Sequence, residues 1–96
     1  MTQTRHSKGY VYVVSNPAWP GWFKVGCSQK MRRRLGNYQT GSPFRDYRLH
    51  HSRYFDDMDA AESGAHDQLR KLSAEHNGEW FKVDLSTAVR VVERLY

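Results

Sequence analysis

The chain lacks the features that mark most secreted and membrane proteins. It has a single cysteine, Cys27, which excludes an internal disulfide and is typical of proteins from a reducing compartment. No apolar run approaches the roughly 18 residues of a membrane-spanning helix, and the N-terminal residues MTQTRHSKG lack the apolar core of a signal peptide. We therefore expect a soluble, cytoplasmic protein with no membrane partner.

Acidic residues are also absent from the first half of the chain. Residues 1–45 contain eight lysines and arginines and no aspartate or glutamate, whereas residues 46–96 contain ten acidic and seven basic residues. A cationic half is what a surface for a polyanion needs. The asymmetry favours nucleic acid as a partner. The acidic half allows two interpretations, a metal site or a solvated counterweight.

The length of 96 residues allows one domain with one modest core. The hydrophobic share of 39% is low, but three Trp, six Tyr and four Phe add bulk to that core. We expect residues 1–7 to be a flexible N-terminus and residues 8–96 to form a single domain.

Residue periodicity and turn residues predict the element order β-β-α-β-α-β-α. The predicted strands cover residues 9–16, 22–27, 46–55 and 79–83. The predicted helices run from about 29 to 38 behind the cap Ser28, from Asp56 or Asp57 to about 73, and from Asp84 or Ser86 onward. Together they predict an α+β domain in which helices flank a small central sheet, mixed or antiparallel.

Apolar stripes predict which faces of the later elements are buried. The helical stripes are Met58, Ala61, Ala65, Leu69 and Leu72, and then Ala88, Val91, Val92 and Leu95. In the third strand, alternation predicts one shared side for Tyr47, Leu49, His51, Arg53 and Phe55.

The first two strands carry polar groups on what we expect to be one patch of the sheet. Tyr10 and Tyr12 are two residues apart and share a face, and Lys24 and Gly26 share a face of the partner strand. Two phenols and an ammonium group would be an odd core, which favours a functional site. The bland alternative is that the tyrosines pack under a helix and Lys24 points to water.

Three consecutive arginines follow this hairpin. Arg32, Arg33 and Arg34 span about 200° of a helix, so they cannot all have one role. One of them could stabilise the negative charge that builds on a phosphate during displacement, while the others contact flanking phosphates. Such a run is also typical of a solvated helix face.

Glu62 is a candidate metal ligand, because it lies near the boundary of an apolar stripe among small residues. Mg²⁺ typically takes only one or two protein carboxylates, together with water and substrate phosphate. A helix-stabilising surface glutamate is the alternative. His66 faces the same way four residues later, but with only Cys27 in addition the set is poor for zinc. We expect His50 and His51 on opposite faces of their strand, unable to chelate together.

Several short motifs follow one another in a specific order. Tyr10-Val11-Tyr12 is followed four residues later by Asn16, and Lys24-Val25-Gly26 follows on the next strand. Further on come residues 38–43 (YQTGSP) and residues 78–81 (GEWF). In this order and spacing, residues 8–81 resemble the GIY-YIG nuclease superfamily, and the last two segments resemble a phage and prophage branch of it.

The resemblance implies hydrolysis of a phosphodiester bond at one Mg²⁺ or Mn²⁺ ion. Arg34 corresponds to the catalytic arginine of the superfamily, and Glu62 to its metal-binding glutamate. Tyr12, or a neighbouring group, would draw the proton from the attacking water. Tyr10, Lys24 and Tyr38 would line the site.

Two positions depart from the superfamily pattern. Tyr10 stands at the first glycine, where position matters more than chemistry. Lys24 stands at the second tyrosine, where it offers a donor and a charge for phosphate but, at an ordinary pKa near 10.4, a poor base. The departure leaves the general base open, with Tyr12 favoured. Glu79 is the second choice as a metal ligand, because its place before Trp80 suggests a structural role.

We therefore expect a metal-dependent DNA endonuclease from a bacterium or a phage-infected cell, guided by weak intrinsic specificity or by a separate targeting protein or domain. The residues expected to contact nucleic acid are Lys30, Arg32, Arg33, Tyr38 and Arg45. Two alternatives remain: a non-catalytic module that binds nucleic acid with a nuclease-like fold, and a phage module for protein–protein interaction.

Overall fold

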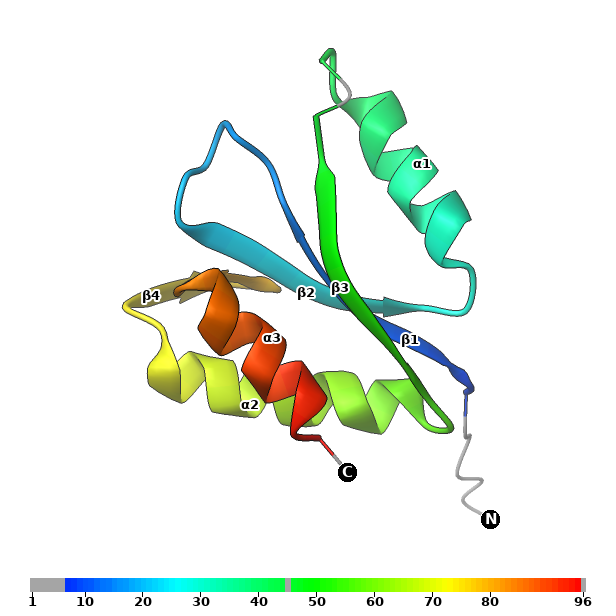
Figure 1. Ribbon diagram of the computed structural model, residues 1–96, viewed down its shortest axis with the longest axis vertical. Helices are drawn as coiled ribbons and strands as arrows, with labels where there is room; N and C mark the ends of the chain where they lie inside the picture. Colours follow the sequence, from blue (N-terminus) through cyan, green and yellow to red (C-terminus); the bar gives the residue numbers. More distant parts are fainter. Residues whose placement is uncertain (1–6, 45, 96) are drawn as a thin grey trace.

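One five-stranded sheet and three helices make up the computed structural model, which describes residues 7–44 and 46–95 (Figure 1). The strands are β1 (Gly9–Ser15), β2 (Trp22–Ser28), β3 (Arg48–Phe55), β4 (Glu75–Asn77) and β5 (Trp80–Lys82). The helices are α1 (Met31–Gly41), α2 (Met58–Leu72) and α3 (Leu85–Glu93). The predicted α+β class is confirmed.

All neighbouring strands run antiparallel, in the order β3-β1-β2-β5-β4. The sequence did not predict β4, because its residues Glu-His-Asn are polar, fully on the surface and without β-branched side chains. It forms because Gly78 turns the chain with a φ of 58°, which lets β4 pair with β5 across a two-residue loop.

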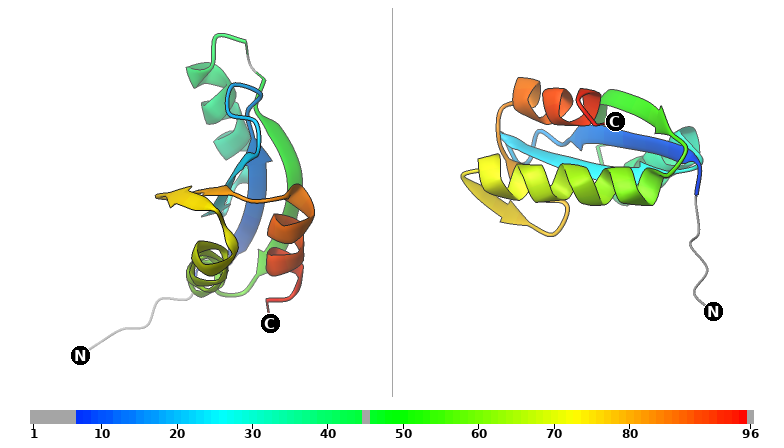
Figure 2. Two further views of the ribbon diagram at one scale, coloured as in Figure 1. Left: turned by 90° about the vertical axis from the view of Figure 1, so that its left-hand side faces the viewer. Right: turned by 90° about the horizontal axis from the view of Figure 1, so that it is seen from below.

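The hydrophobic core lies between one face of the sheet and the helices α2 and α3. Val11 and Val13 of β1 are fully buried there, against Ala65 and Leu69 of α2 and Val92 of α3. The predicted stripe of α3 is confirmed in full. The stripe of α2 is confirmed at its centre, but Leu72 is 58% exposed because the helix ends at this residue. The helices α2 and α3 lie together at the end of the molecule opposite α1 (Figures 1 and 2).

The helix starts agree only partly with their predicted caps. The carboxylate of Asp57 accepts a hydrogen bond from the backbone N–H of Ala60 at 3.1 Å, as a cap of α2. The predicted cap Ser28 is wrong, since it is a buried residue at the end of β2. Its Oγ accepts a hydrogen bond from the backbone N–H of Lys30 at 3.1 Å, and α1 starts only at Met31.

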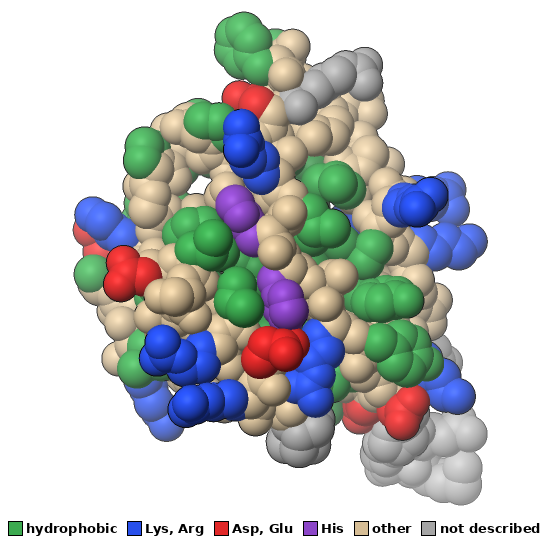
Figure 3. Space-filling view, viewed as in Figure 1, with side chains coloured by type: hydrophobic (Ala, Val, Ile, Leu, Met, Phe, Trp, Pro, Cys, Tyr) green, Lys and Arg blue, Asp and Glu red, His purple; other side chains and the backbone are tan. Residues whose placement is uncertain are grey.

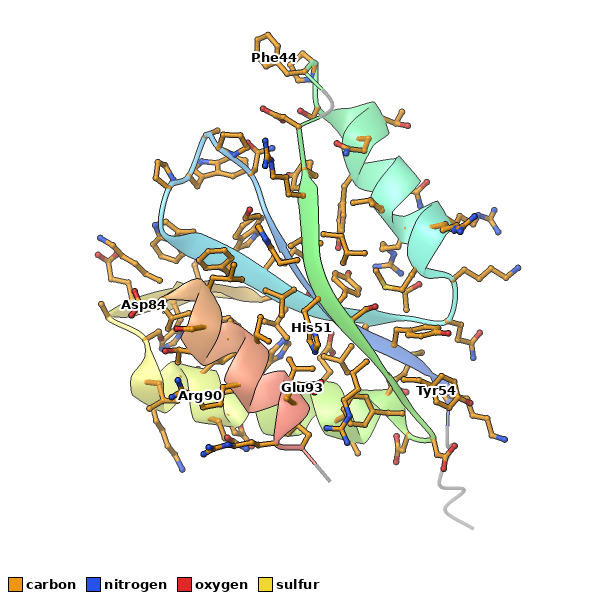
Figure 4. All side chains as sticks on the ribbon, in the orientation of Figure 1. Phe44, His51, Tyr54, Asp84, Arg90 and Glu93 are labelled. Atoms are coloured by element: carbon orange, nitrogen blue, oxygen red, sulfur yellow. The ribbon has the colours of Figure 1, made fainter. Side chains whose placement is uncertain are left out.

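A β-bulge in β3 overturns the prediction for its histidines. The register with β1 shifts after Val13, so that His50 is an extra residue in β3. His50 then contacts Ser15 and Phe23, on the side of the sheet where His51 meets Glu93 of α3 at 2.8 Å (Figure 4). The two histidines thus lie on the same side, each with its own partner. Leu49 pairs with Val14 and lies on the other side from His51, Arg53 and Phe55, because the bulge reverses the alternation.

The end of α3 is held in place by Arg53. Its Nη1 donates hydrogen bonds to the carbonyl oxygens of Val92, Glu93 and Leu95, at 3.0, 2.9 and 2.6 Å. These bonds satisfy carbonyls that a helix end leaves without partners.

The other face of the sheet carries α1, and this helix packs lightly. It has no buried residue, and its described contacts are made mainly by polar side chains. The side-chain amide of Gln39 both donates to the carbonyl of Tyr47 at 2.8 Å and accepts from its N–H at 2.9 Å. This clamp ties the end of α1 to the segment that enters β3.

Residues 1–6 of the N-terminal segment that we expect to be flexible lie outside the described residues. Ser7 is described, and its carbonyl accepts a hydrogen bond from the N–H of Met58 at 2.8 Å. No helix in the described part of the chain has the length and apolar character needed to cross a membrane.

Candidate active site

Tyr12 is the centre of the polar face of the sheet. Its ring is fully buried, and its hydroxyl lies 2.6 Å from the hydroxyl of Tyr38 on α1. Gly26 pairs with Tyr12 across β1 and β2, and a Cβ at Gly26 would stand 2.5 Å from the Tyr12 hydroxyl oxygen. Only glycine leaves room for the phenol to cross β2. Tyr12 and Gly26, which the sequence predicted on one patch of the sheet, are therefore in contact.

Arg34 joins this pair from α1, four residues and thus about one turn before Tyr38. Hydrogen bonding to the hydroxyls of Tyr38 and Tyr12 raises the pKa of Arg34, so its charge is permanent. Burial and the bond to Tyr38 raise the pKa of Tyr12 far above 10, although Arg34 acts in the opposite direction. In the free protein Tyr12 is therefore a neutral phenol.

Lys24 and Glu79 complete this side of the site. The Lys24 Nζ lies 3.8 Å from the Glu79 Oε1 and 5.1 Å from the centre of the Tyr38 ring. A Cβ at Gly26 would also be 3.2 Å from Glu79 Oε1, so this carboxylate lies beside the Tyr12 hydroxyl. Glu79, which the sequence suggested to be structural, thus belongs to the site.

Glu62 approaches from α2, near the part of β2 that extends beyond β5. It is partly buried, and burial followed by the negative charge of Glu79 raises its pKa. Cys27 lies between Glu62 and Asp59, with its Sγ 3.8 Å from Asp59 Oδ1. Burial and the nearby carboxylates raise the pKa of the Cys27 thiol to about 12. Negative charge therefore accumulates on this side of β2.

These carboxylates fit a hard divalent cation better than zinc. Among the described residues, no three His, Cys, Asp or Glu side chains come together in a way that could hold a metal ion. His66 is engaged elsewhere, with its Nε2 2.6 Å from the carbonyl oxygen of Val25. Mg²⁺ and Mn²⁺ need only one or two carboxylates, and their charge would compensate the repulsion between Glu62 and Glu79. The donor set thus fits such an ion.

A polar cleft of about 600 Å³ lies between α1, the end of β2 and the start of α2. One wall consists of Lys30, Arg33, Arg34 and Asn37, which are spaced three and four residues apart and so share a helix face. Cys27, Asp59 and residues around them form the opposite wall. Positively charged side chains gather over α1 at the edge of the molecule (Figure 3). The cleft therefore places a cationic wall opposite Cys27 and the carboxylate of Asp59.

Other predicted residues lie outside this cluster. Tyr10 is on the same face as Tyr12, but it is 36% exposed and its ring packs edge-on against Tyr54 at 5.5 Å. Arg32 is exposed on α1 and is not part of the cleft wall. Arg45 lies outside the described residues.

Tyr38 was predicted both to contact nucleic acid and, from the resemblance, to line the site, and the structure places it beside Tyr12. Its spacing of four residues from Arg34 agrees with this position, because such pairs share a helix face. Tyr47 stacks on Tyr38 with ring centres 5.3 Å apart, and it was missed as a neighbour of the site because it precedes β3.

The fold is a small α+β domain with an antiparallel sheet. Phenols, an arginine and two carboxylates lie near the end of β2 that does not pair with β5. The chain belongs to the T5orf172 domain family, a phage-associated family whose model matches residues 9–96. Neither the curated proteins nor the solved structures gave a match to the chain.

Proposed function

We propose that this protein is a metal-dependent DNA endonuclease of the GIY-YIG type. The observation that carries the proposal is the meeting of Tyr12 and Arg34 with Tyr38 at Gly26, with the Glu79 carboxylate beside them and Glu62 close enough to Glu79 for the two charges to interact. Membership in a phage-associated family supports a role on nucleic acid. The cationic cleft beside the cluster supports a polyanionic substrate.

The positively charged side chains have different proposed roles, according to where they lie. Arg34 stabilises the charge that develops on the scissile phosphate, because its guanidinium lies beside the Tyr38 and Tyr12 hydroxyls and stays charged. Lys24 holds a phosphate oxygen as a mobile cation beside the phenols. Lys30 and Arg33 contact the flanking backbone along the cleft, and the exposed Arg32 adds to binding outside it.

Mg²⁺ or Mn²⁺ would supply Lewis-acid polarisation of the phosphate, and Glu62 would hold it, with Glu79 as the second carboxylate. Tyr12 orients the attacking water through its hydroxyl. It can accept a proton only when positive charge in the complex brings its pKa down, because in the free protein burial keeps it protonated.

The domain offers little surface for reading a long DNA sequence. The cleft is polar and of modest length, and its cationic side chains suit phosphates more than base edges. We therefore infer weak intrinsic specificity, or targeting by a separate protein or domain.

The test is the nicking of supercoiled plasmid by the purified protein with Mg²⁺, with Mn²⁺ and with EDTA. Wild type should nick only with a metal, and Glu62→Gln should lose about 1,000-fold or more in rate, because a catalytic metal is worth several kcal/mol. Glu75→Gln is the matched control, since Glu75 makes only an exposed ion pair with Lys82.

Other results would assign the protein to a different class. Wild type that shifts DNA in a gel but leaves it intact with both metals would point to a non-catalytic nucleic-acid-binding module. Protein that neither binds nor cuts would point to an interaction module.

A further inference from the structure

A second hollow, separate from the cleft, is lined by aromatic side chains. It has a volume of about 370 Å³, and its walls are Trp19, Trp22, Tyr47, Asn77 and Trp80. These residues come from the β1–β2 turn, from β2, from the segment before β3 and from the β4–β5 hairpin. The chain has three tryptophans, and all of them line this one hollow.

The exposed position of Trp19 is not explained by folding. The turn that carries it is closed by backbone bonds, from Trp19 N–H to the Asn16 carbonyl at 3.0 Å and from Trp22 N–H to the Trp19 carbonyl at 3.2 Å. The Trp19 ring meets Trp80 edge to face at 5.5 Å, and the residue remains 49% exposed. An edge-on contact leaves a ring face open to a flat ligand.

The hollow adjoins the candidate active site through Lys24. The Lys24 Nζ lies 6.0 Å from the centre of the Trp80 ring and 5.1 Å from that of Tyr38. Tyr38 in turn stacks on Tyr47, which lines the hollow. One cation therefore stands between the aromatic walls and the phenols of the site.

This combination matches the chemistry of an unpaired nucleotide. A nucleobase is flat and stacks on Trp or Tyr whatever its identity, and its phosphate is an anion for Lys24. The Asn77 side-chain amide has both a donor and an acceptor for the polar edge of a base. An apolar peptide would use the aromatic walls but would gain nothing from the adjacent ammonium group.

We propose that the aromatic hollow binds one unpaired base of a DNA strand whose backbone continues past Lys24 into the candidate active site. The link to the active site rests on the proposed endonuclease function. The binding itself does not, and it can be measured with no cleavage taking place.

The test is tryptophan fluorescence in EDTA during titration with a single-stranded thymidine oligonucleotide of roughly 10 nucleotides. Stacking should quench the emission, and every tryptophan reports on the hollow. An abasic oligonucleotide of the same length and charge is the control and should quench little. Trp19→Leu should weaken binding by about 5- to 100-fold, whereas Trp19→Phe should keep most of it.

Equal binding of the abasic strand, or unchanged affinity of Trp19→Leu with a wild-type melting temperature, would overturn the proposal. So would the absence of quenching. Glu62→Gln should quench like wild type, which separates the two proposals. Wild type that quenches but does not nick with either metal would contradict only the endonuclease, and wild type that nicks without quenching would contradict only the stacking site.

Discussion

The two faces of the sheet carry different kinds of side chain. On the core face, fully buried valines of β1 meet the alanines and leucine of α2 and the valines of α3. On the other face, a buried phenol, a lysine and a glycine meet a helix with no buried residue at all. Alternate residues of the same strands supply both faces, as the pleat of a strand requires.

Because of this difference, one face of the sheet mainly stabilises the fold, and the other carries the candidate active site. Apolar burial stabilises the fold on the core face, at roughly 25 cal/mol per Å² removed from water. On the polar face, hydrogen bonds and charges fix a few side chains in place and contribute less to folding. Substitutions on the polar face should therefore change activity with little effect on stability, and those on the core face should do the reverse.

Among substitutions on the polar face of the sheet, Arg34→Ala should have the largest effect on activity. If Arg34 is the donor to the scissile phosphate that we propose, its loss should lower the nicking rate by about 100- to 1,000-fold, while the melting temperature stays near that of wild type. Arg90→Ala, an exposed arginine of α3, is the matched control (Figure 4). A large loss of stability in Arg34→Ala would show that α1 is part of the folding core after all.

Leu69→Ala should give the opposite pattern. Leu69 is fully buried in α2, so its truncation should cost about 2–5 kcal/mol in the free energy of unfolding, measured by urea denaturation. The nicking rate per folded molecule should be unchanged. Leu72→Ala is the control, because Leu72 is 58% exposed and should cost far less.

Gly26→Ala should moderately lower both the stability and the nicking rate. The new Cβ would collide with the Tyr12 hydroxyl, and relieving this overlap should cost about 1–3 kcal/mol of stability. Displacement of the phenol should also slow nicking. Gly36→Ala, where the added Cβ meets no atom, should be neutral or slightly stabilising. Equal activity of the two variants would argue against a role for Tyr12.

The smallest effect should come from Glu62→Gln on stability in EDTA. Burial and Glu79 raise the pKa of Glu62, so its protonated form is favoured in the folded state. The stability linked to this proton is complete below the unfolded pKa near 4.3 and is lost as pH rises through the folded pKa. Glu62→Gln should therefore melt at or slightly above the wild-type temperature at pH 7, and the difference should vanish near pH 4. A lower melting temperature at pH 7 would mean that the Glu62 charge stabilises the fold.

Much of the fold followed from the sequence, because long periodic segments such as α2 and α3 have strong apolar stripes. The register of β3 did not, since a bulge at His50 depends on pairing with β1 and has no signal in a single strand. The strand β4 was missed because three polar residues form a strand only when a partner offers its edge.

The site was predictable where motif positions fixed the geometry, as for Tyr12 opposite Gly26. The position of Glu79 was not predictable, because its proximity to Lys24 and Gly26 arises from the pairing of β5 with β2. The shared hollow of the tryptophans was equally hidden, since its walls come from four separate segments. Contacts between distant segments are what a pattern along the chain cannot show.

Because β5 is short, part of the β2 edge stays unpaired, and this affects whether copies of the protein associate at high concentration. Pairing with β5 covers Trp22–Lys24, with one further bond from Val25 to the Glu79 carbonyl, and the last residues of β2 run beyond it. An uncovered strand is a template on which a second chain can add. Here Glu62, Asp59 and Glu79 gather around Cys27 on that same stretch. Direct pairing of two such stretches would bring these carboxylates close together, and their repulsion would oppose the addition of a second copy at this edge.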